Sequence, residues 1–151
     1  MEAMAKRLLV YASIGHFTVA LLHYVMPFLG SWAYAYFGAP ELTEMAEKGS
    51  NWPAISTFAL AVIFTVFGTM GLSAAGIMRS WPYIRAVLWV VGIVYVLRGL
   101  LVTVQISYVL QGLLSARHAV YSMVALAIGL CQLWGLWRSR GSRTSTPSHA
   151  A

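Results

Sequence analysis

Four long apolar segments, separated by short polar connectors, limit what this chain can fold into. Only 9% of its 151 residues are charged and 60% are hydrophobic, whereas a soluble domain carries about 25% charged residues. A helix needs about 20 apolar residues to cross a bilayer, and each segment is that long. The sequence therefore predicts an all-α bundle of four transmembrane helices in one domain, residues 1–137, followed by a disordered basic tail, residues 138–151. The predicted spans are 8–29, 53–76, 85–105 and 119–137.

The end of the third span is open, because apolar residues continue from 106 to 114 either as a longer helix or as an interfacial segment.

The longest connector, residues 30–52, predicts a short amphipathic helix between the first two spans. Pro40 suits a first helical position, and Glu41 suits the positive end of the helix dipole. Glu44 and Lys48 are four residues apart, a spacing that lets opposite charges pair on one helical face. The connector begins with aromatic side chains that favour the headgroup level of a membrane: Trp32, Tyr34, Tyr36 and Phe37.

The basic residues predict the orientation of the spans. With four spans, both termini and the connector between spans 2 and 3 share one side of the membrane. This side holds seven Lys and Arg residues, against two on the other side. Because positively charged loops stay in the cytoplasm, we expect a multi-pass protein with both termini and the tail in the cytoplasm and the amphipathic helix facing outward. The net charge of +6 follows from this asymmetry, and it does not predict a nucleic-acid partner.

Arg98 places a positive charge inside the third span. A charge in the hydrocarbon costs roughly 3 to more than 10 kcal/mol, so such a residue is normally paired, hydrated or functional. At ~1.5 Å per residue, Arg98 lies ~20 Å beyond Arg85, in the outer half of the bilayer. Tyr95 and Gln105 share its helical face. The sequence thus predicts a polar, ligand-binding pocket that surrounds Arg98 and opens outward.

Residues of the first span and of the connector are expected to complete this pocket. His16 and His23 are seven residues apart and lie on one helical face, while Glu41 and Glu44 are expected to close the pocket from outside. Plainer roles are open for each: Arg98 reaching the headgroups or pairing with a connector glutamate, the histidines linking helices, and the glutamates forming a hydrated helix face. The predicted ligand-binding residues are Arg98, His23, Tyr95, Gln105, His16, Glu41 and Glu44.

Several kinds of site are not expected. The chain has no Asp, and none of its four Glu residues lies in a predicted span. Cys131 is the single cysteine, so neither an internal disulfide nor a CxxC motif is present. We expect no catalytic residue, no metal site and no cofactor. Close helix packing is predicted in the second half of span 2, where small residues gather: Gly68, Gly71, Ser73, Ala74, Ala75 and Gly76.

Three short motifs are Phe37-Gly38-Ala39-Pro40-Glu41, Gly71-Leu72-Ser73-Ala74-Ala75-Gly76 and Tyr95-Val96-Leu97-Arg98-Gly99-Leu100. With them, residues 8–137 resemble a group of small bacterial membrane proteins that are predicted to have four helices and have no established activity. A looser likeness, in architecture alone, is to the DoxX-like four-helix proteins. These resemblances imply a compact bundle in a bacterial inner membrane, and they imply no catalytic residue.

Several function classes fit these patterns. The first is a non-enzymatic bundle that binds a lipid or a small apolar or anionic molecule, or acts as an accessory subunit. The second is an oligomeric transporter or channel for an anionic solute, because no span carries the carboxylate that a proton-coupled cation exporter needs. A small haem-b protein that uses His23 and His118 and an intramembrane enzyme with an acid–base site below the connector are further alternatives. We predict the first class, with membrane lipids and either a homo-oligomer or a larger membrane protein as partners.

Overall fold

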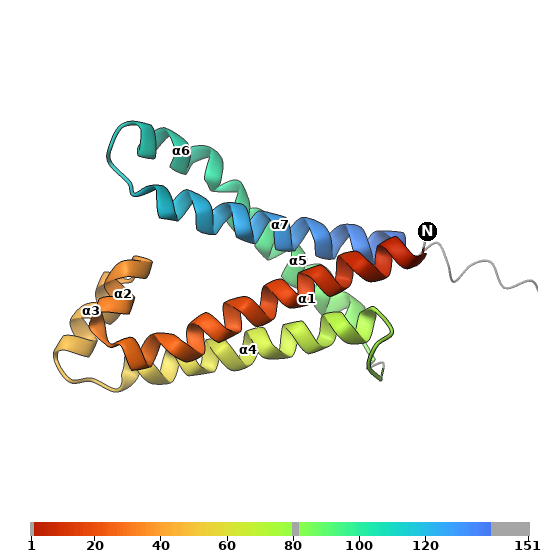
Figure 1. Ribbon diagram of the computed structural model, residues 1–151, viewed down its shortest axis with the longest axis horizontal. Coiled ribbons are helices and arrows are strands. Elements are labelled where there is room, and N and C mark those ends of the chain that lie inside the picture. The colour runs from red at the N-terminus through yellow and green to blue at the C-terminus, as the bar shows by residue number, and fades with distance from the viewer. Residues whose placement is uncertain (1, 80–81, 140–151) are drawn as a thin grey trace, which may run out of the picture. The chain divides into compact units, whose positions relative to one another are not determined.

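The computed structural model describes residues 2–79 and 82–139, and helices account for most of them (Figure 1). No strand occurs among these described residues. In chain order the elements are α1 (Glu2–Val25), the 3-10 helix η1 (Met26–Leu29), α2 (Ser31–Phe37), α3 (Pro40–Glu47), α4 (Trp52–Ala74), α5 (Ile84–Leu100), α6 (Val102–Leu110) and α7 (Ala116–Arg138).

Within the described residues, four helical stretches are long and apolar enough to cross a membrane. The predicted fold class, all-α with four spans and a short helix between the first two, is confirmed, and the chain is a multi-pass membrane protein. The stretches start earlier than the apolar composition suggests, because helical hydrogen bonding does not stop where polar residues begin. Their bounds are Glu2–Leu29, Trp52–Ala74, Ile84–Leu110 and Ala116–Arg138. Of the predicted tail, residues 140–151 lie outside the described residues.

The chain divides into two compact units, which are described separately. One unit, here called the Arg98 unit, is formed by Met1–Ser13 together with Thr69–Ala151; the other, the connector unit, is formed by Ile14–Gly68. The helices α1 and α4 each contribute to both units. The Arg98 unit also contains α5, α6 and α7, and the connector unit contains η1, α2 and α3.

In the connector unit, the polar connector folds as η1, α2 and α3. Helix α3 begins at Pro40, and an ion pair joins Glu44 Oε1 to Lys48 Nζ at 2.5 Å, both as the sequence predicts. Gly30 and Gly38, at the two ends of α2, have φ angles of 68° and 80°. A side chain with a Cβ would be strained in this left-handed region, so these two glycines set where α2 begins and ends.

Tyr34 of α2 is buried within the connector unit. Its side chain is 2% exposed and belongs to a cluster with Met26 and Ala33, whereas Trp32 is 60% exposed. One face of the short helix α2 therefore packs inward and carries Tyr34, while the headgroup-level position of the aromatic cluster stays a prediction. Among the described residues, the buried Tyr34 hydroxyl has no hydrogen-bond partner.

In the Arg98 unit, α5 and α7 pack along each other as an antiparallel pair (Figure 1). Glycines permit the close approach. A Cβ added at Gly99 would lie 2.5 Å from the Cβ of Leu126, and one added at Gly92 would lie 2.6 Å from a side-chain carbon of Leu133. Because lipid removes the hydrophobic effect as a force between helices, such tight packing is a main source of their association.

Polar side chains link the same two helices. Gln132, 1% exposed, donates from Nε2 to the carbonyl oxygen of Leu88 at 2.6 Å. At the start of α5, Arg85 Nη2 donates to the carbonyl oxygen of Leu136 and to Ser139 Oγ, each at 2.8 Å. These hydrogen bonds fix the register of α5 against α7.

The small residues of span 2 also pack closely, as the sequence predicts. In the Arg98 unit, Gly71 faces the Ser13 hydroxyl at a separation that leaves no room for a Cβ. In the connector unit, a Cβ added at Gly68 would lie 2.7–2.9 Å from ring carbons of Phe17. The two glycines therefore let α4 approach α1 in each unit.

The third span continues past residue 105, with an interruption at Leu101. Helix α5 ends at Leu100, and α6 carries the apolar helix on to Leu110; whether α6 crosses the bilayer or lies at its interface stays open. The interruption falls between Arg98 and Gln105, so these two polar residues lie on different helices.

We expect Gly99→Leu to destabilise the protein by about 3 kcal/mol, because the added side chain overlaps the backbone of Leu126 and α7 has to move away. Ala127→Leu is the matched control, since Ala127 lies on the exposed face of α7 and should tolerate the same side chain. Thermal unfolding in detergent, followed by circular dichroism, measures both. Equal melting temperatures for the two variants would contradict the close packing of α5 on α7.

We expect Tyr34→Phe to raise stability by about 1 kcal/mol, because it removes a buried hydroxyl that lacks a hydrogen-bond partner and keeps the packed ring. Tyr36→Phe, at a position 42% exposed, is the control and should leave the melting temperature unchanged. A clear loss of stability in Tyr34→Phe alone would indicate that the hydroxyl has a partner.

Candidate functional site

Arg98 is the centre of the candidate site, and it lies in the last turn of α5. Its Nη1 donates a hydrogen bond to Ser122 Oγ of α7 at 2.6 Å. Ser122 Oγ in turn donates to Gln105 Oε1 of α6 at 2.7 Å. One hydroxyl thus connects three helices, and it does so across the interruption between α5 and α6.

The Ser122 hydroxyl holds the guanidinium group in place. Ser122 is 0% exposed, so it accepts and donates its hydrogen bonds away from solvent, where each bond is stronger than in water. Gln105 is half-buried, while Arg98 is exposed on the outer surface of the Arg98 unit. The network is therefore anchored at its buried end and presents a positive charge at its open end.

The open end of the network can bind an anion. A guanidinium group carries five N–H donors in a planar fork that matches the oxygens of a carboxylate or a phosphate. Among the described residues, Arg98 makes one hydrogen bond, the one to Ser122, so further donors of this side chain face the surroundings of an apolar helix. Such donors have to meet water, a headgroup or a ligand, because hydrocarbon accepts no hydrogen bond.

Tyr95 lies three residues before Arg98 on α5 and is half-buried, which fits the predicted shared face. Of the seven predicted ligand-binding residues, three therefore belong to the Arg98 unit: Tyr95, Arg98 and Gln105. The structure brings Arg98 and Gln105 together, but through Ser122 rather than by direct contact.

The two histidines belong to the connector unit. His16 is 0% exposed and its ring meets the Phe67 ring edge-on, with 5.9 Å between centroids. His23 is half-buried, forms a hydrogen bond from Nδ1 to the carbonyl oxygen of Val19 at 2.8 Å, and lies edge-on to Phe64. These contacts are those of packed helical histidines.

The two connector glutamates also belong to the connector unit, on α3. Glu41 and Glu44 are both exposed, and Glu44 pairs with Lys48. A pocket shared by the histidines, these glutamates and Arg98 stays a prediction. No group of three or more His, Cys, Asp or Glu residues lies close enough to bind a metal ion within residues 2–79 and 82–139.

Ser122 is the residue of this site that the sequence analysis does not single out. Its signal is a stripe of small and polar residues along α7, in which Gly129 follows Ser122 after seven residues and Gln132 lies three residues after Gly129. In a membrane helix, such a stripe marks the face that packs against another helix. A serine on that face is positioned to accept a hydrogen bond from Arg98.

We expect Ser122→Ala to lower stability by about 0.5–2 kcal/mol, the range for hydrogen bonds between membrane helices, because it removes both bonds of the network. Ser107→Ala is the control, since the Ser107 hydroxyl bonds to the carbonyl oxygen of Val104 on its own helix. In an Arg98→Gln background the cost of Ser122→Ala should shrink, since the two residues act together. Equal costs of Ser122→Ala in both backgrounds would contradict the coupling; thermal unfolding measures them.

No family model, curated protein or solved structure matches this chain. The resemblance to small bacterial four-helix membrane proteins accordingly rests on its three short motifs alone. The function has to be argued from the residues and contacts described above.

Proposed function

We propose that this protein is a non-enzymatic membrane protein that binds an anionic amphiphile at Arg98. The ligand class is a lipid or a small apolar molecule that carries a phosphate or carboxylate. Its anionic group pairs with the guanidinium, and its apolar part lies along the apolar surfaces of α5 and α6.

The observation that carries this proposal is the hydrogen bond from Arg98 to Ser122. It orients the guanidinium at the end of α5 and leaves other N–H donors directed away from the buried hydroxyl. A charged group held in this way costs free energy in an apolar segment. Binding of an anion with an apolar tail offsets that cost, because the anion supplies hydrogen-bond acceptors and the tail replaces lipid.

Membrane lipids are the proposed partners, and a homo-oligomer or a larger membrane protein is a further proposed assembly. We also propose a bacterial inner membrane, with both termini in the cytoplasm. Seven basic residues on the side of the termini, against two on the other, support this orientation. Arg98 would then lie in the half of the bilayer away from the cytoplasm.

Purified protein in dodecyl maltoside, titrated with dodecyl phosphate, tests the binding. Dodecyltrimethylammonium has the same tail and the opposite charge, so it reports non-specific partitioning. We expect the phosphate to raise the melting temperature of the unmodified protein. In Arg98→Gln we expect about tenfold weaker apparent binding, since charge-assisted hydrogen bonds are lost.

Lys48→Gln is the matched control for this experiment, because it removes one exposed positive charge far along the chain from Arg98. It should bind dodecyl phosphate as the unmodified protein does. The proposal fails if Arg98→Gln keeps full binding, or if the cationic amphiphile stabilises the protein equally well.

A further inference from the structure

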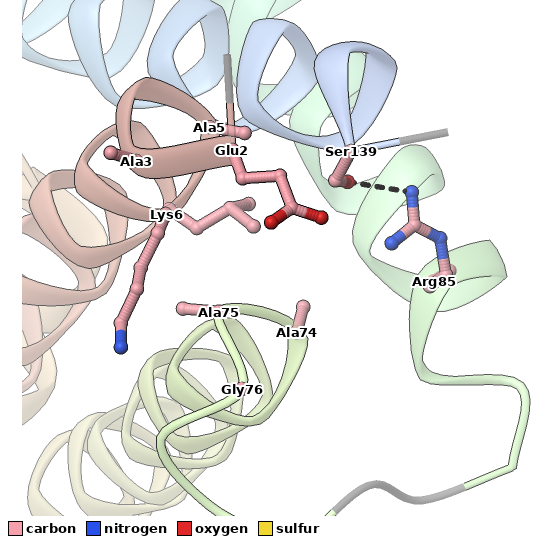
Figure 2. Close-up of a pocket in the computed structure, with 10 residues that line it drawn as sticks. Glu2, Ala3, Ala5, Lys6, Ala74, Ala75, Gly76, Arg85 and Ser139 are labelled. Atoms are coloured by element: carbon pink, nitrogen blue, oxygen red, sulfur yellow. Dashed lines mark hydrogen bonds between the residues drawn. The ribbon is translucent and has the colours of Figure 1, made fainter. Parts of the chain in front are cut away.

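The two ends of α5 are attached to α7 in different ways. At the start of α5, Arg85 Nη2 donates to the carbonyl oxygen of Leu136 and to Ser139 Oγ, each at 2.8 Å (Figure 2). A cavity of about 490 Å³ opens there, and Glu2, Lys6 and Arg85 are among the residues that line it. Both Glu2 and Arg85 interact within the chain, so the start of α5 is firmly attached to its surroundings.

At the other end of α5, the chain leaves the packed region of the Arg98 unit. Gly99 is the last buried residue of α5, and Ser122 is the first buried residue of α7. Between them, no residue from 100 to 121 is buried. This segment, here called the α6 hairpin, contains α6 and the first turns of α7. With so little side-chain packing, the hairpin belongs to the least stable part of the unit.

The break at Leu101 gives the α6 hairpin a point about which it can turn. Thr103 Oγ1 donates to the carbonyl oxygen of Leu100 at 2.8 Å, so a side chain takes part in the hydrogen bonding next to the break. Hydroxyl groups that bond back to a preceding carbonyl often bend a helix. Residues at the end of an element are also the usual hinges of moving segments. We therefore treat Leu101 as a hinge between α5 and α6.

Gln105 ties α6 to α7 beyond this hinge. Its Oε1 accepts a hydrogen bond from Ser122 Oγ at 2.7 Å. The Ser107 hydroxyl, one turn of α6 further on, bonds instead to the carbonyl oxygen of Val104 within α6. The angle between α5 and α6 is therefore coupled to the bond between Gln105 and Ser122.

The same bond directs the Ser122 hydroxyl toward the role that Arg98 needs. A hydroxyl group has one proton to donate and two lone pairs that accept. When the proton points to Gln105, the lone pairs are available to the Arg98 guanidinium, which donates to this oxygen at 2.6 Å. If α6 turns away, Gln105 leaves with it and the Ser122 proton has to find another acceptor. The guanidinium then loses its fixed orientation.

We propose that Gln105 is a positioning residue for the anion site, and that an anion bound at Arg98 fixes the angle between α5 and α6. This inference rests on the proposed binding at Arg98 and adds a regulated element to it. The position of α6 that holds Gln105 at Ser122 presents an oriented guanidinium, so it binds an anion more tightly than other positions do. Because coupling between two equilibria is reciprocal, the anion favours this position of α6 by the same factor.

Distances between two spin labels, measured by double electron–electron resonance, test the coupling. Cys131→Ser removes the single cysteine, and Val90→Cys on α5 and Leu110→Cys at the end of α6 then carry the labels at exposed positions. The full chain is measured in dodecyl maltoside with dodecyl phosphate or, as the charge control, dodecyltrimethylammonium. We expect the phosphate to narrow the distribution of the 90–110 distance and the cation to leave it unchanged.

A second label pair is the reference for this measurement. Val90→Cys with Met123→Cys, also exposed, joins α5 to α7 across the closely packed pair. Because this pair does not include the hinge at Leu101, we expect its distance distribution to be the same with and without dodecyl phosphate.

Gln105→Met assigns the coupling to one side chain, because it keeps the size of the side chain and removes the acceptor oxygen. We expect it to broaden the 90–110 distribution without ligand and to abolish most of the narrowing. It should also weaken dodecyl phosphate binding about threefold, the effect of one hydrogen bond between membrane helices. Gln111→Met is the matched control, because it makes the same exchange at an exposed residue just after α6 and should behave as the unmodified protein does.

The inference is overturned if dodecyl phosphate binds but leaves the 90–110 distance unchanged, or if Gln105→Met keeps full binding and full narrowing. An equal loss in Gln111→Met would also overturn it. Arg98→Gln separates the two proposals. Weaker binding in Arg98→Gln together with an unresponsive distance overturns the coupling alone, whereas full binding in Arg98→Gln overturns the anion site and the coupling with it.

Discussion

Hydrogen bonds between α5 and α7 are the interactions on which the Arg98 unit depends. In lipid the hydrophobic effect does not drive two apolar helices together, so close packing and interhelical hydrogen bonds have to do so. Gly92 and Gly99 let the two backbones approach closely. Gln132 of α7 then donates a hydrogen bond to the carbonyl oxygen of Leu88 on α5. The close packing and the hydrogen bonds fix the register of α5 against α7. This register places Ser122 beside Arg98.

The same pair positions two arginines at separate levels along α5. Arg85 at the start of α5 and Arg98 near its end are thirteen residues apart, or ~20 Å along the helix. Each arginine is anchored by a group on α7, Arg85 by Leu136 and Ser139 and Arg98 by Ser122. One helix pair thus holds two cations at separate levels along α5, each oriented by a group on α7.

Much of the architecture was predictable from the sequence, while the Ser122 hydroxyl that links Arg98 to Gln105 was not. Hydropathy gives the four spans, and the pair Pro40 and Glu44 gives the connector helix, because both are local properties of the chain. Tyr34 shows the limit of this reasoning: the run of aromatic residues does not indicate which of them one face of α2 buries. The interruption between α5 and α6 is also not predicted, because its residue, Leu101, is neither a proline nor a glycine.

The number of spans, the position of the short helix and the presence of a charge within an apolar segment all follow from the amino-acid order alone. These features depend on the free energy of transfer from water to lipid, which acts residue by residue. By contrast, the hydrogen bond between Ser122 and Arg98 and the meeting of Glu2, Lys6 and Arg85 at one cavity become visible once the helices are packed. Such groupings depend on the register between helices distant in sequence, and register is set by packing and hydrogen bonds that no single segment contains.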